Sequence, residues 1–310
     1  MTTEFQRLAW RTSQSFKKAI NAVASRLAVW LLKIIRLADA EKMSNVGGWL
    51  MRKIGPRLRE HEFGRANLIA AFPEKSPAEI ERILMGAWDN LGRTSAEFAH
   101  LDKLRFYDPA NPAPSDVFAE PESYEHAARI RTDGKPALIF AAHLANWEIP
   151  AISAVKFNFD ATILFRRPNL AGVAEAVSEI RGASMAPLIP SGPTAPFVIT
   201  AALEQGKHVG MLVDQHYERG VEVMFFGRRC KANPMLARLA RHFECPIHGT
   251  RVVRTGPRRF RVDLTDEIKP PRDADGKISI EGTMQMITSM IEDWVREHPE
   301  QWLWQHRRWR

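Results

Sequence analysis

The spacing of apolar residues changes along the chain from a helical period to short continuous runs. Between residues 43 and 106, apolar residues recur three and four positions apart, which predicts helices. One of these helices is expected to begin at Ser76, a good N-cap that is followed by Pro77 at the first helical position. From residue 122 onward, short apolar runs alternate with helical stretches, which is typical of an α/β fold with a mostly parallel sheet flanked by helices.

The second half of the chain yields a definite order of elements. Strands are expected at residues 137–142, 161–165, 187–189, 208–213, 247–254 and 260–264, and helices at 122–132, 147–155, 173–181, 197–205, 234–243 and 283–297. Residues 107–121 are rich in proline and predict an irregular connection, and residues 214–233 are read as a loop. We therefore divide the chain into an N-terminal segment at 1–42, a helical region packed on the core at 43–121 and an α/β core at 122–310.

The stretch from Ala19 to Ala38 is apolar but is interrupted by Arg26, Lys33 and Arg36. No run reaches the roughly 18–20 uninterrupted apolar residues that a membrane-spanning helix needs. The apolar positions recur at helical spacing, which predicts a basic amphipathic helix. Such a helix either lies in a membrane interface or packs on its own domain. The interruptions also argue against a cleavable signal peptide.

Composition and charge narrow the classes of partner. The chain is 45% hydrophobic and 26% charged, enough to bury a core, and its two cysteines cannot form a disulfide framework. No Cys/His spacing indicates a metal site, and we expect no metal and no cofactor. The net charge is +8, and the basic residues gather in two zones, residues 1–60 and 228–261. This distribution implies an anionic partner, which could be a nucleic acid, an anionic membrane or an acidic substrate or carrier.

The sharpest chemical feature is the sequence His143-Leu144-Ala145-Asn146-Trp147-Glu148, directly after an apolar strand. In open α/β sheets, sites form where strands end and helices begin. The carboxylate of Glu148, in the first turn of the expected helix, can return toward the imidazole of His143 and fix its tautomer. The other ring nitrogen is then free to accept a proton from a hydroxyl. The ordinary alternative is a surface histidine beside a glutamate that caps a helix.

Several stretches match one enzyme family in order and spacing: Phe63 to Leu68 with Phe72-Pro73, His143 to Glu148, Leu164 to Asn169, Asp214-Gln215 followed by Gly220-Val221 and Phe225-Phe226-Gly227, and the ending from His298 to Trp309. The chain from about Gly47 to Arg310 resembles the late acyltransferases of lipid A biosynthesis, the lauroyl and myristoyl type, whose motif is His-x4-Glu. The resemblance implies a glycerolipid-acyltransferase-like fold. The sequence departs from the family pattern in two places. The hydrophobic N-terminal anchor that is common in the family is here broken by basic residues. The Thr-rich stretch that commonly follows Gly227 is absent, and its polar role either passes to Asn233 or is lost.

The resemblance also implies residue roles. His143 would be the general base, Glu148 would orient it and stabilise its charge, and Arg166 would stabilise the oxyanion, with backbone N–H groups near Leu144 to Asn146 as the alternative. Asn146 would hold the substrate or the loop, and Asp214 would orient a substrate group, bind a basic residue such as Arg166 or form a purely structural ion pair. The remaining substrate-binding candidates are Gln215 and the basic group Arg228, Arg229 and Lys231, which suits lipid phosphates or an acidic carrier protein.

The function implied by the resemblance is transfer of a fatty acyl group from acyl carrier protein to a hydroxyl of a lipid A precursor of the Kdo-lipid A type. The expected partners are therefore acyl carrier protein, this lipid and a membrane surface. The expected location is the cytoplasmic face of the inner membrane, with peripheral attachment. Two alternatives stay open, namely acylation of another lipid alcohol such as glycerophosphate and, more remotely, a basic nucleic-acid-binding protein. No RRM, KH or helix-turn-helix pattern favours the latter, so we expect no nucleic-acid partner.

Overall fold

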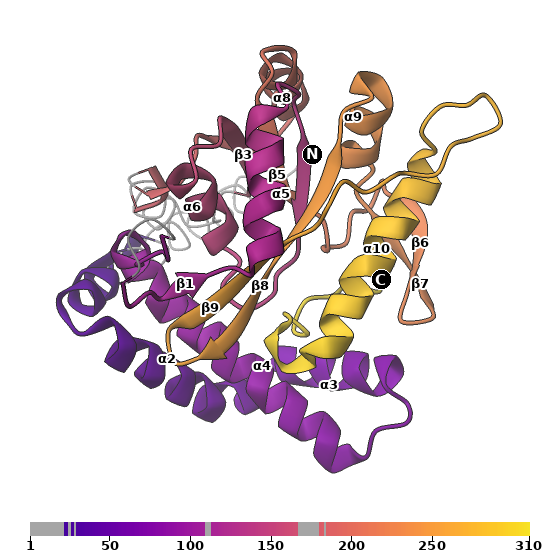
Figure 1. Cartoon of the computed structure of the whole chain (residues 1–310). Helices are drawn as coiled ribbons and strands as arrows, with labels where there is room; N and C mark the ends of the chain where they lie inside the picture. The colour runs from indigo at the N-terminus through magenta and orange to yellow at the C-terminus, as the bar shows by residue number, and fades with distance from the viewer. Residues whose placement is uncertain (1–21, 24–25, 28, 109–112, 167–179, 183) are drawn as a thin grey trace, which may run out of the picture.

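A seven-stranded sheet forms the centre of the computed structural model (Figure 1), which describes residues 22–23, 26–27, 29–108, 113–166, 180–182 and 184–310. The strand order is β1-β9-β8-β2-β5-β3-β4, and every pairing is parallel except the antiparallel pair β8–β9. The strands are β1 (Val117–Phe118), β2 (Leu138–Ala141), β3 (Ala161–Phe165), β4 (Leu188–Pro190), β5 (His208–Leu212), β8 (Ile247–Gly256) and β9 (Arg259–Leu264). The predicted α/β class with a mostly parallel sheet is confirmed.

Helices cover both faces of this sheet. They are α5 (Pro121–Thr132), α6 (Ile149–Lys156), α8 (Ala195–Glu204), α9 (Met235–Phe243) and α10 (Ile280–Glu297). Side chains of β2 alternate between the faces, as the strand geometry requires. Phe140 stacks on Trp294 of α10 at 5.6 Å, whereas Ile139 points to the opposite side, toward α5 and α6. Figure 1 shows α5 and α6 on one side of the sheet and α9 and α10 on the other.

Three further helices lie across one end of the sheet (Figure 1). They are α2 (Ala40–Ile54), α3 (Arg59–Ala71) and α4 (Pro77–Glu97). The predicted start of α4 is confirmed, because the Ser76 side chain caps the helix and Glu79 completes a capping box. The first of them, α2, ends at Ile54 because Pro56 follows and the chain turns before α3 begins.

The segment after β5 contains a β-hairpin where the sequence predicted a loop. β6 (Val221–Phe225) and β7 (Arg228–Ala232) pair antiparallel. Both turn residues have positive φ, 52° at Phe226 and 67° at Gly227, as a tight two-residue hairpin turn requires. The aromatic Phe226 is an unusual residue for that conformation, which explains why the pattern was not read as a turn.

The N-terminal apolar face is exposed in the part of the chain that the structure describes. We use this name for Val23, Leu27, Trp30, Leu31, Ile34 and Leu37, which are all exposed. Residues 29–37 are helical, and Arg36 anchors this helix to Asp102 through a two-point ion pair at 2.7 and 3.0 Å. Among the described residues, no helix is long and apolar enough to cross a membrane. Parts of the helices expected at 19–38 and 173–181 lie outside the described residues.

Candidate active site

Two neighbouring parallel strands bring the central residues of the site together. β2 ends at Ala141 and is followed by His143, and β5 ends at Leu212 and is followed by Asp214. The two strands pair in register, with Ala141 opposite Leu212. Their carboxyl ends therefore meet at the same edge of the sheet, where sites of α/β proteins form.

Asp214 holds the backbone and the ring of His143 at once. Its Oδ1 lies 2.7 Å from His143 Nδ1, and its Oδ2 accepts the backbone N–H of His143 at 2.8 Å. The indole N–H of Trp302 donates to the same Oδ2 at 2.8 Å. Because a carboxylate can only accept, Nδ1 carries the proton in the neutral ring and Nε2 presents a lone pair. The amide nitrogen of Gln215 lies 3.1 Å from Nε2.

Neighbouring charges and hydrogen bonds shift the pKa values of His143 and Asp214 in opposite directions. Burial alone would lower the pKa of His143, but the charge and hydrogen bond of Asp214, and then the charge of Glu148, raise it above its usual value. Burial alone would raise the pKa of Asp214, but its interactions with His143 and Trp302 hold that pKa well below the usual range. Asp214 thus stays ionised and stabilises the imidazolium that forms when Nε2 accepts a proton.

Glu148 does not make the hydrogen bond that the sequence predicted for it. Its carboxylate pairs with Arg181, at 2.5 Å to Nη2 and 2.9 Å to Nε, and the guanidinium lies over the rings of Phe98 and Phe165. The prediction of a Glu148–imidazole hydrogen bond is therefore wrong, and Asp214 occupies that position. Glu148, five residues after His143, instead raises the pKa of the imidazole through its charge. Asp214 and Arg181 were not predicted in these contacts because both come from distant segments.

The loop between His143 and Glu148 is clamped by α4. Ala145 has φ 46°, a strained conformation for a residue with a side chain. Its carbonyl accepts hydrogen bonds from Asn90 and Thr94 of α4, at 3.1 and 2.9 Å. Asn146 is fully buried and donates to Glu97, while its oxygen accepts the backbone N–H of Glu148. Of the two roles expected for Asn146, these contacts favour holding the loop.

Two of the backbone N–H groups that were candidates for the oxyanion site already donate hydrogen bonds within the protein. The N–H of Leu144 donates to Ala142 O at 2.7 Å, and the N–H of Ala145 donates to Gln301 O at 2.9 Å. These two donors are thus occupied, whereas the N–H of Asn146 makes no hydrogen bond among the described residues. Arg166, which follows β3, lines the same cavity as His143 and is exposed. Arg166 and the N–H of Asn146 therefore both stay candidates for the oxyanion site.

A buried ion pair holds Glu97, which accepts the hydrogen bond from Asn146. Glu97 is 3% exposed and pairs with Arg254 of β8, whose Nη1 lies 2.6 Å from Oε1. Burial alone would raise the pKa of Glu97, but Arg254, Ser44 and Asn146 together lower it. The carboxylate therefore stays charged beside the loop between His143 and Glu148, and neither partner was singled out as a site residue by the sequence.

Replacing Glu97 by glutamine is expected to lower the free energy of unfolding by about 3 kcal/mol, because Arg254 would be left buried without a counter-charge. The measurement is denaturant unfolding at neutral pH. Glu81→Gln, on the same helix, is the matched control, since its carboxylate is 40% exposed where it meets Arg65 and His61, and these contacts are expected to contribute about 1 kcal/mol or less. Equal losses for the two variants would contradict the structural role of Glu97.

A cavity of about 490 Å³ opens beside His143 and is called the active-site cavity. Its polar lining is concentrated at the ends of the strands, with His143, Glu148, Arg166, Arg181 and Gln215. Its apolar lining comes from β2, β3, β4, β5 and α6 and from Met185, and consists of Ile139, Ala141, Ala151, Ala154, Ile163, Leu164, Phe165, Met185, Leu188 and Met211. A proton-accepting histidine at the mouth of an apolar cavity suits chemistry on the polar end of a hydrocarbon chain.

The predicted basic group lies elsewhere, on the hairpin β6–β7. Arg228 contacts the ring of Trp309, and Arg229 is exposed near Glu222. Lys231 donates to the carbonyl of Glu218. None of the three lines the active-site cavity, whereas Asn233, just beyond the hairpin, does. Trp302 and Trp304, near the C-terminus, are buried in the core.

A comparison with known protein families shows to which of them the chain belongs. The model of the bacterial lipid A biosynthesis acyltransferases matches residues 11–310, nearly the whole chain. The chain belongs to this family. A search of curated proteins found no match. As a lipid A acyltransferase, the protein transfers an acyl group in lipid A biosynthesis, and at the ends of β2 and β5 the His143–Asp214 pair adjoins a largely apolar cavity.

Proposed function

We propose that this lipid A acyltransferase moves a fatty acyl chain from acyl carrier protein to a hydroxyl of a lipid A precursor of the Kdo-lipid A type. The observation that carries the proposal is the His143–Asp214 pair at the mouth of the apolar cavity. His143 Nε2 is the general base in this proposal, and Asp214 fixes the tautomer that leaves Nε2 free. Gln215 caps Nε2 and gives way to the acceptor hydroxyl, which then takes the same hydrogen-bonding position.

The proposed reaction needs no covalent intermediate on the enzyme, because the thioester donor is already activated. Nε2 removes the hydroxyl proton as the hydroxyl oxygen attacks the thioester carbon. The carbonyl oxygen becomes negatively charged in the tetrahedral intermediate, and Arg166 stabilises it. The carbon–sulfur bond then breaks, and the departing thiolate takes the proton back from Nε2. Near-normal turnover of a folded Arg166→Ala variant would exclude Arg166 from this role.

Glu148 and Arg181 have a supporting role in the proposal. Their ion pair lines the cavity close to His143, and the carboxylate raises the pKa of the imidazole by its charge. The pair also fixes Arg181 between Phe98 and Phe165.

The basic group on the hairpin is proposed to contact phosphates of the lipid or the acidic carrier protein from outside the cavity, because Arg229 is well exposed. A folded Arg229→Ala variant with wild-type KM for both substrates would exclude Arg229 from these contacts.

The decisive experiment is transfer with purified components, followed by mass spectrometry of the lipid. Acyl carrier protein loaded with a fatty acid is incubated with the protein and an under-acylated Kdo-lipid A. The expected product is heavier than the acceptor by one acyl group. Glycerol 3-phosphate in place of the lipid is expected to give no product. Acylation of glycerophosphate alone would favour the alternative reaction, and failure with both acceptors would contradict the proposal.

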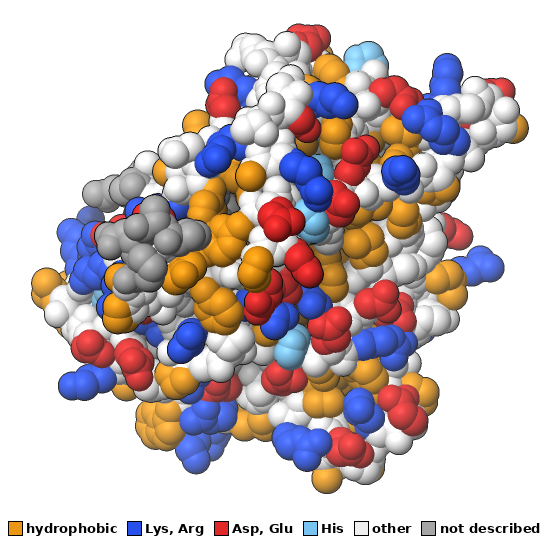
Figure 2. Space-filling model, viewed as in Figure 1, with side chains coloured by type: hydrophobic (Ala, Val, Ile, Leu, Met, Phe, Trp, Pro, Cys, Tyr) orange, Lys and Arg blue, Asp and Glu red, His pale blue; other side chains and the backbone are white. Residues whose placement is uncertain are grey.

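Membrane attachment is proposed to occur through the N-terminal apolar face. Its exposed residues lack a partner among the described part of the chain, and exposed Val46, Trp49, Leu50 and Ile54 extend the apolar surface onto α2. Figure 2 shows hydrophobic and basic side chains side by side along the lower edge, over α2 and α3. Apolar and basic groups together suit an anionic membrane surface, such as the proposed cytoplasmic face of the inner membrane.

Deleting residues 1–35 keeps the Arg36–Asp102 ion pair and the Asp39 cap of α2, so the remaining fold is expected to stay intact. The deletion is expected to lower partitioning into vesicles containing anionic lipid by about tenfold or more, since several exposed apolar side chains are lost. Sedimentation with vesicles measures this effect, and Trp49→Glu in the shortened chain is expected to reduce the residual binding. Unchanged sedimentation of both variants would place the attachment elsewhere.

A further inference from the structure

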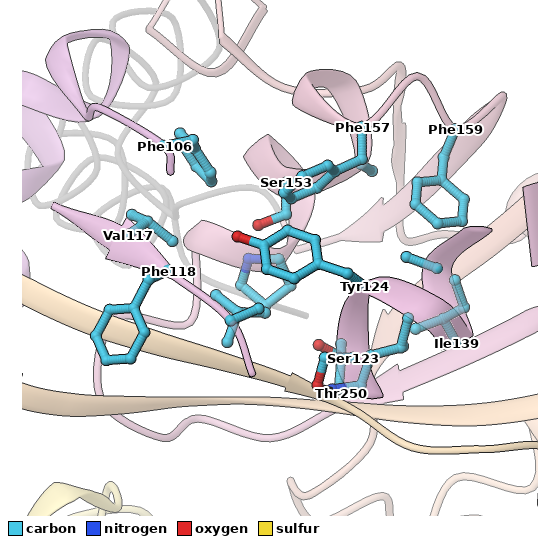
Figure 3. Close-up of a pocket in the computed structure, with 16 residues that line it drawn as sticks. Phe106, Val117, Phe118, Ser123, Tyr124, Ile139, Ser153, Phe157, Phe159 and Thr250 are labelled. Atoms are coloured by element: carbon cyan, nitrogen blue, oxygen red, sulfur yellow. Dashed lines mark hydrogen bonds between the residues drawn. The ribbon is translucent and has the colours of Figure 1, made fainter. Parts of the chain in front are cut away.

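A second, smaller cavity lies between α5, α6 and the sheet. We call it the distal pocket; it measures about 80 Å³, and its lining includes Phe106, Val117, Phe118, Tyr124 and Phe157. Figure 3 shows the rings of Phe106, Tyr124 and Phe157 turned toward a common space, with Ser123 and Thr250 on the side of the sheet. Figure 2 shows hydrophobic side chains gathered between α5 and α6, where this pocket lies.

The hydroxyl groups that line the distal pocket are engaged by the protein itself. Ser153 Oγ donates to the carbonyl of Ile149 at 3.0 Å, and Thr250 Oγ1 donates to the carbonyl of Asp263 at 3.1 Å. Ser123 Oγ accepts a backbone N–H at 3.1 Å. With these groups occupied, the pocket offers mainly apolar surface. A hydrocarbon is therefore the class of ligand that fits it.

The distal pocket adjoins the active-site cavity. Four residues line both spaces: Ile139 of β2, Pro150 and Ala154 of α6, and Thr250 of β8. The residues that α6 contributes to this boundary are small, so the helix does not fill the space above the sheet there. The active-site cavity lies over β3, β5 and β2, and the distal pocket lies over β2, β8 and β9. Because neighbouring strands are about 4.8 Å apart, the two spaces lie within the length of a few methylene groups of each other.

We propose that the distal pocket holds the methyl end of the donor's fatty acyl chain, with its thioester carbon beside His143 and its middle beneath α6. The inference rests on the proposed acyl transfer and adds the path of the chain and the residues that select its length. Ala154 and Ile139 border the passage, and Tyr124 and Phe157 close its far end. Each methylene that the pocket accepts or rejects is expected to change the relative rate of transfer by about tenfold or more.

Photo-crosslinking maps the chain directly. Acyl carrier protein is loaded with dodecanoyl, tetradecanoyl or hexadecanoyl chains that carry a diazirine at the methyl end, and the labelled residues are identified by mass spectrometry. The label is expected to move with increasing length from the active-site cavity to α5 and Phe157. Labelling confined at every length to residues that line only the active-site cavity, such as Met185 and Leu188, would overturn the path while leaving acyl transfer intact. No labelling of either space would contradict both the path and the proposed function.

Substitutions on α5 test the selection of chain length. Ala127 lines the distal pocket, whereas the next residue, Ala128, is exposed and does not line it. In a competition among donors of increasing length, Ala127→Leu is expected to lower the share of the longest accepted chain tenfold or more, with the shortest donor little affected. Ala128→Leu is expected to keep the wild-type distribution, and Phe157→Ala, which enlarges the pocket, is expected to shift it toward longer chains. Wild-type distributions for both Ala127→Leu and Phe157→Ala would overturn the proposal.

Discussion

Replacing His143 by alanine is expected to lower kcat of acyl transfer by about 10²–10⁴-fold, because Nε2 is the proposed acceptor of the hydroxyl proton. No side chain that hydrogen-bonds to the ring can replace it as the base. Gln215, its neighbour at Nε2, has no basic nitrogen, and the carboxylate of Asp214 is turned toward Nδ1 and the indole of Trp302. The measurement is steady-state turnover with saturating donor and acceptor.

The control for this substitution must separate catalysis from folding, because alanine also removes a partner of the buried Asp214. His143→Asn can keep a hydrogen bond to Asp214 but has no group that titrates near neutral pH, so it is expected to be as slow as the alanine variant. His242→Ala, an exposed histidine on α9, is expected to keep wild-type turnover. A folded His143→Asn enzyme with activity within tenfold of wild type would remove His143 as the base.

Replacing Asp214 by asparagine is expected to lower kcat by about 10³-fold through a change of tautomer. Oδ2 accepts two N–H groups, from His143 and Trp302, so the oxygen of the asparagine takes that position. Its NH₂ group then faces Nδ1, which must accept, and the proton of the neutral ring moves to Nε2. The nitrogen that should take the hydroxyl proton is thereby blocked, as known for the aspartate of the serine-protease triad.

Turnover of Asp214→Asn is compared with that of Asp160→Asn, which alters an exposed aspartate at the start of β3 and is expected to leave kcat unchanged. Thermal unfolding of both variants shows whether the site remains folded. Since asparagine keeps the size and hydrogen bonds of aspartate, the fold is expected to survive. A folded Asp214→Asn enzyme that retains more than a tenth of wild-type kcat would contradict the proposed role of the carboxylate.

Elements whose formation depends mainly on residues close together in the sequence were predicted correctly from the sequence pattern. The apolar run before His143 predicted β2, and the Ser76-Pro77 cap predicted the start of α4. The hairpin β6–β7 was missed because its turn places Phe226 in a conformation that sequence patterns associate with glycine or asparagine.

The site was predictable only in part, because its contacts depend on the order of strands in the sheet. His143 was found from its position after a strand, and the family resemblance drew attention to Asp214 but suggested a substrate group or a basic residue such as Arg166 as its partner, not His143. Their hydrogen bond follows from β2 and β5 being neighbours, which no local spacing encodes. The same holds for Arg254 and Glu97, which are 157 residues apart and meet beneath the loop. The distal pocket likewise arises from α5, α6 and β8 together.

The most direct test of the central claim is to compare the titration of His143 with the pH dependence of catalysis. The ¹⁵N NMR signals of the labelled ring report its tautomer and pKa, and kcat/KM is measured over the same pH range. We expect a proton on Nδ1 in the neutral ring, and an acid limb of kcat/KM whose pKa equals that of His143, since only the deprotonated base is active. Because the charge of Glu148 raises the His143 pKa, Glu148→Gln is expected to move both the NMR titration and the acid limb to lower pH together. An acid limb that stays in place while the His143 titration moves would show that another group is the base.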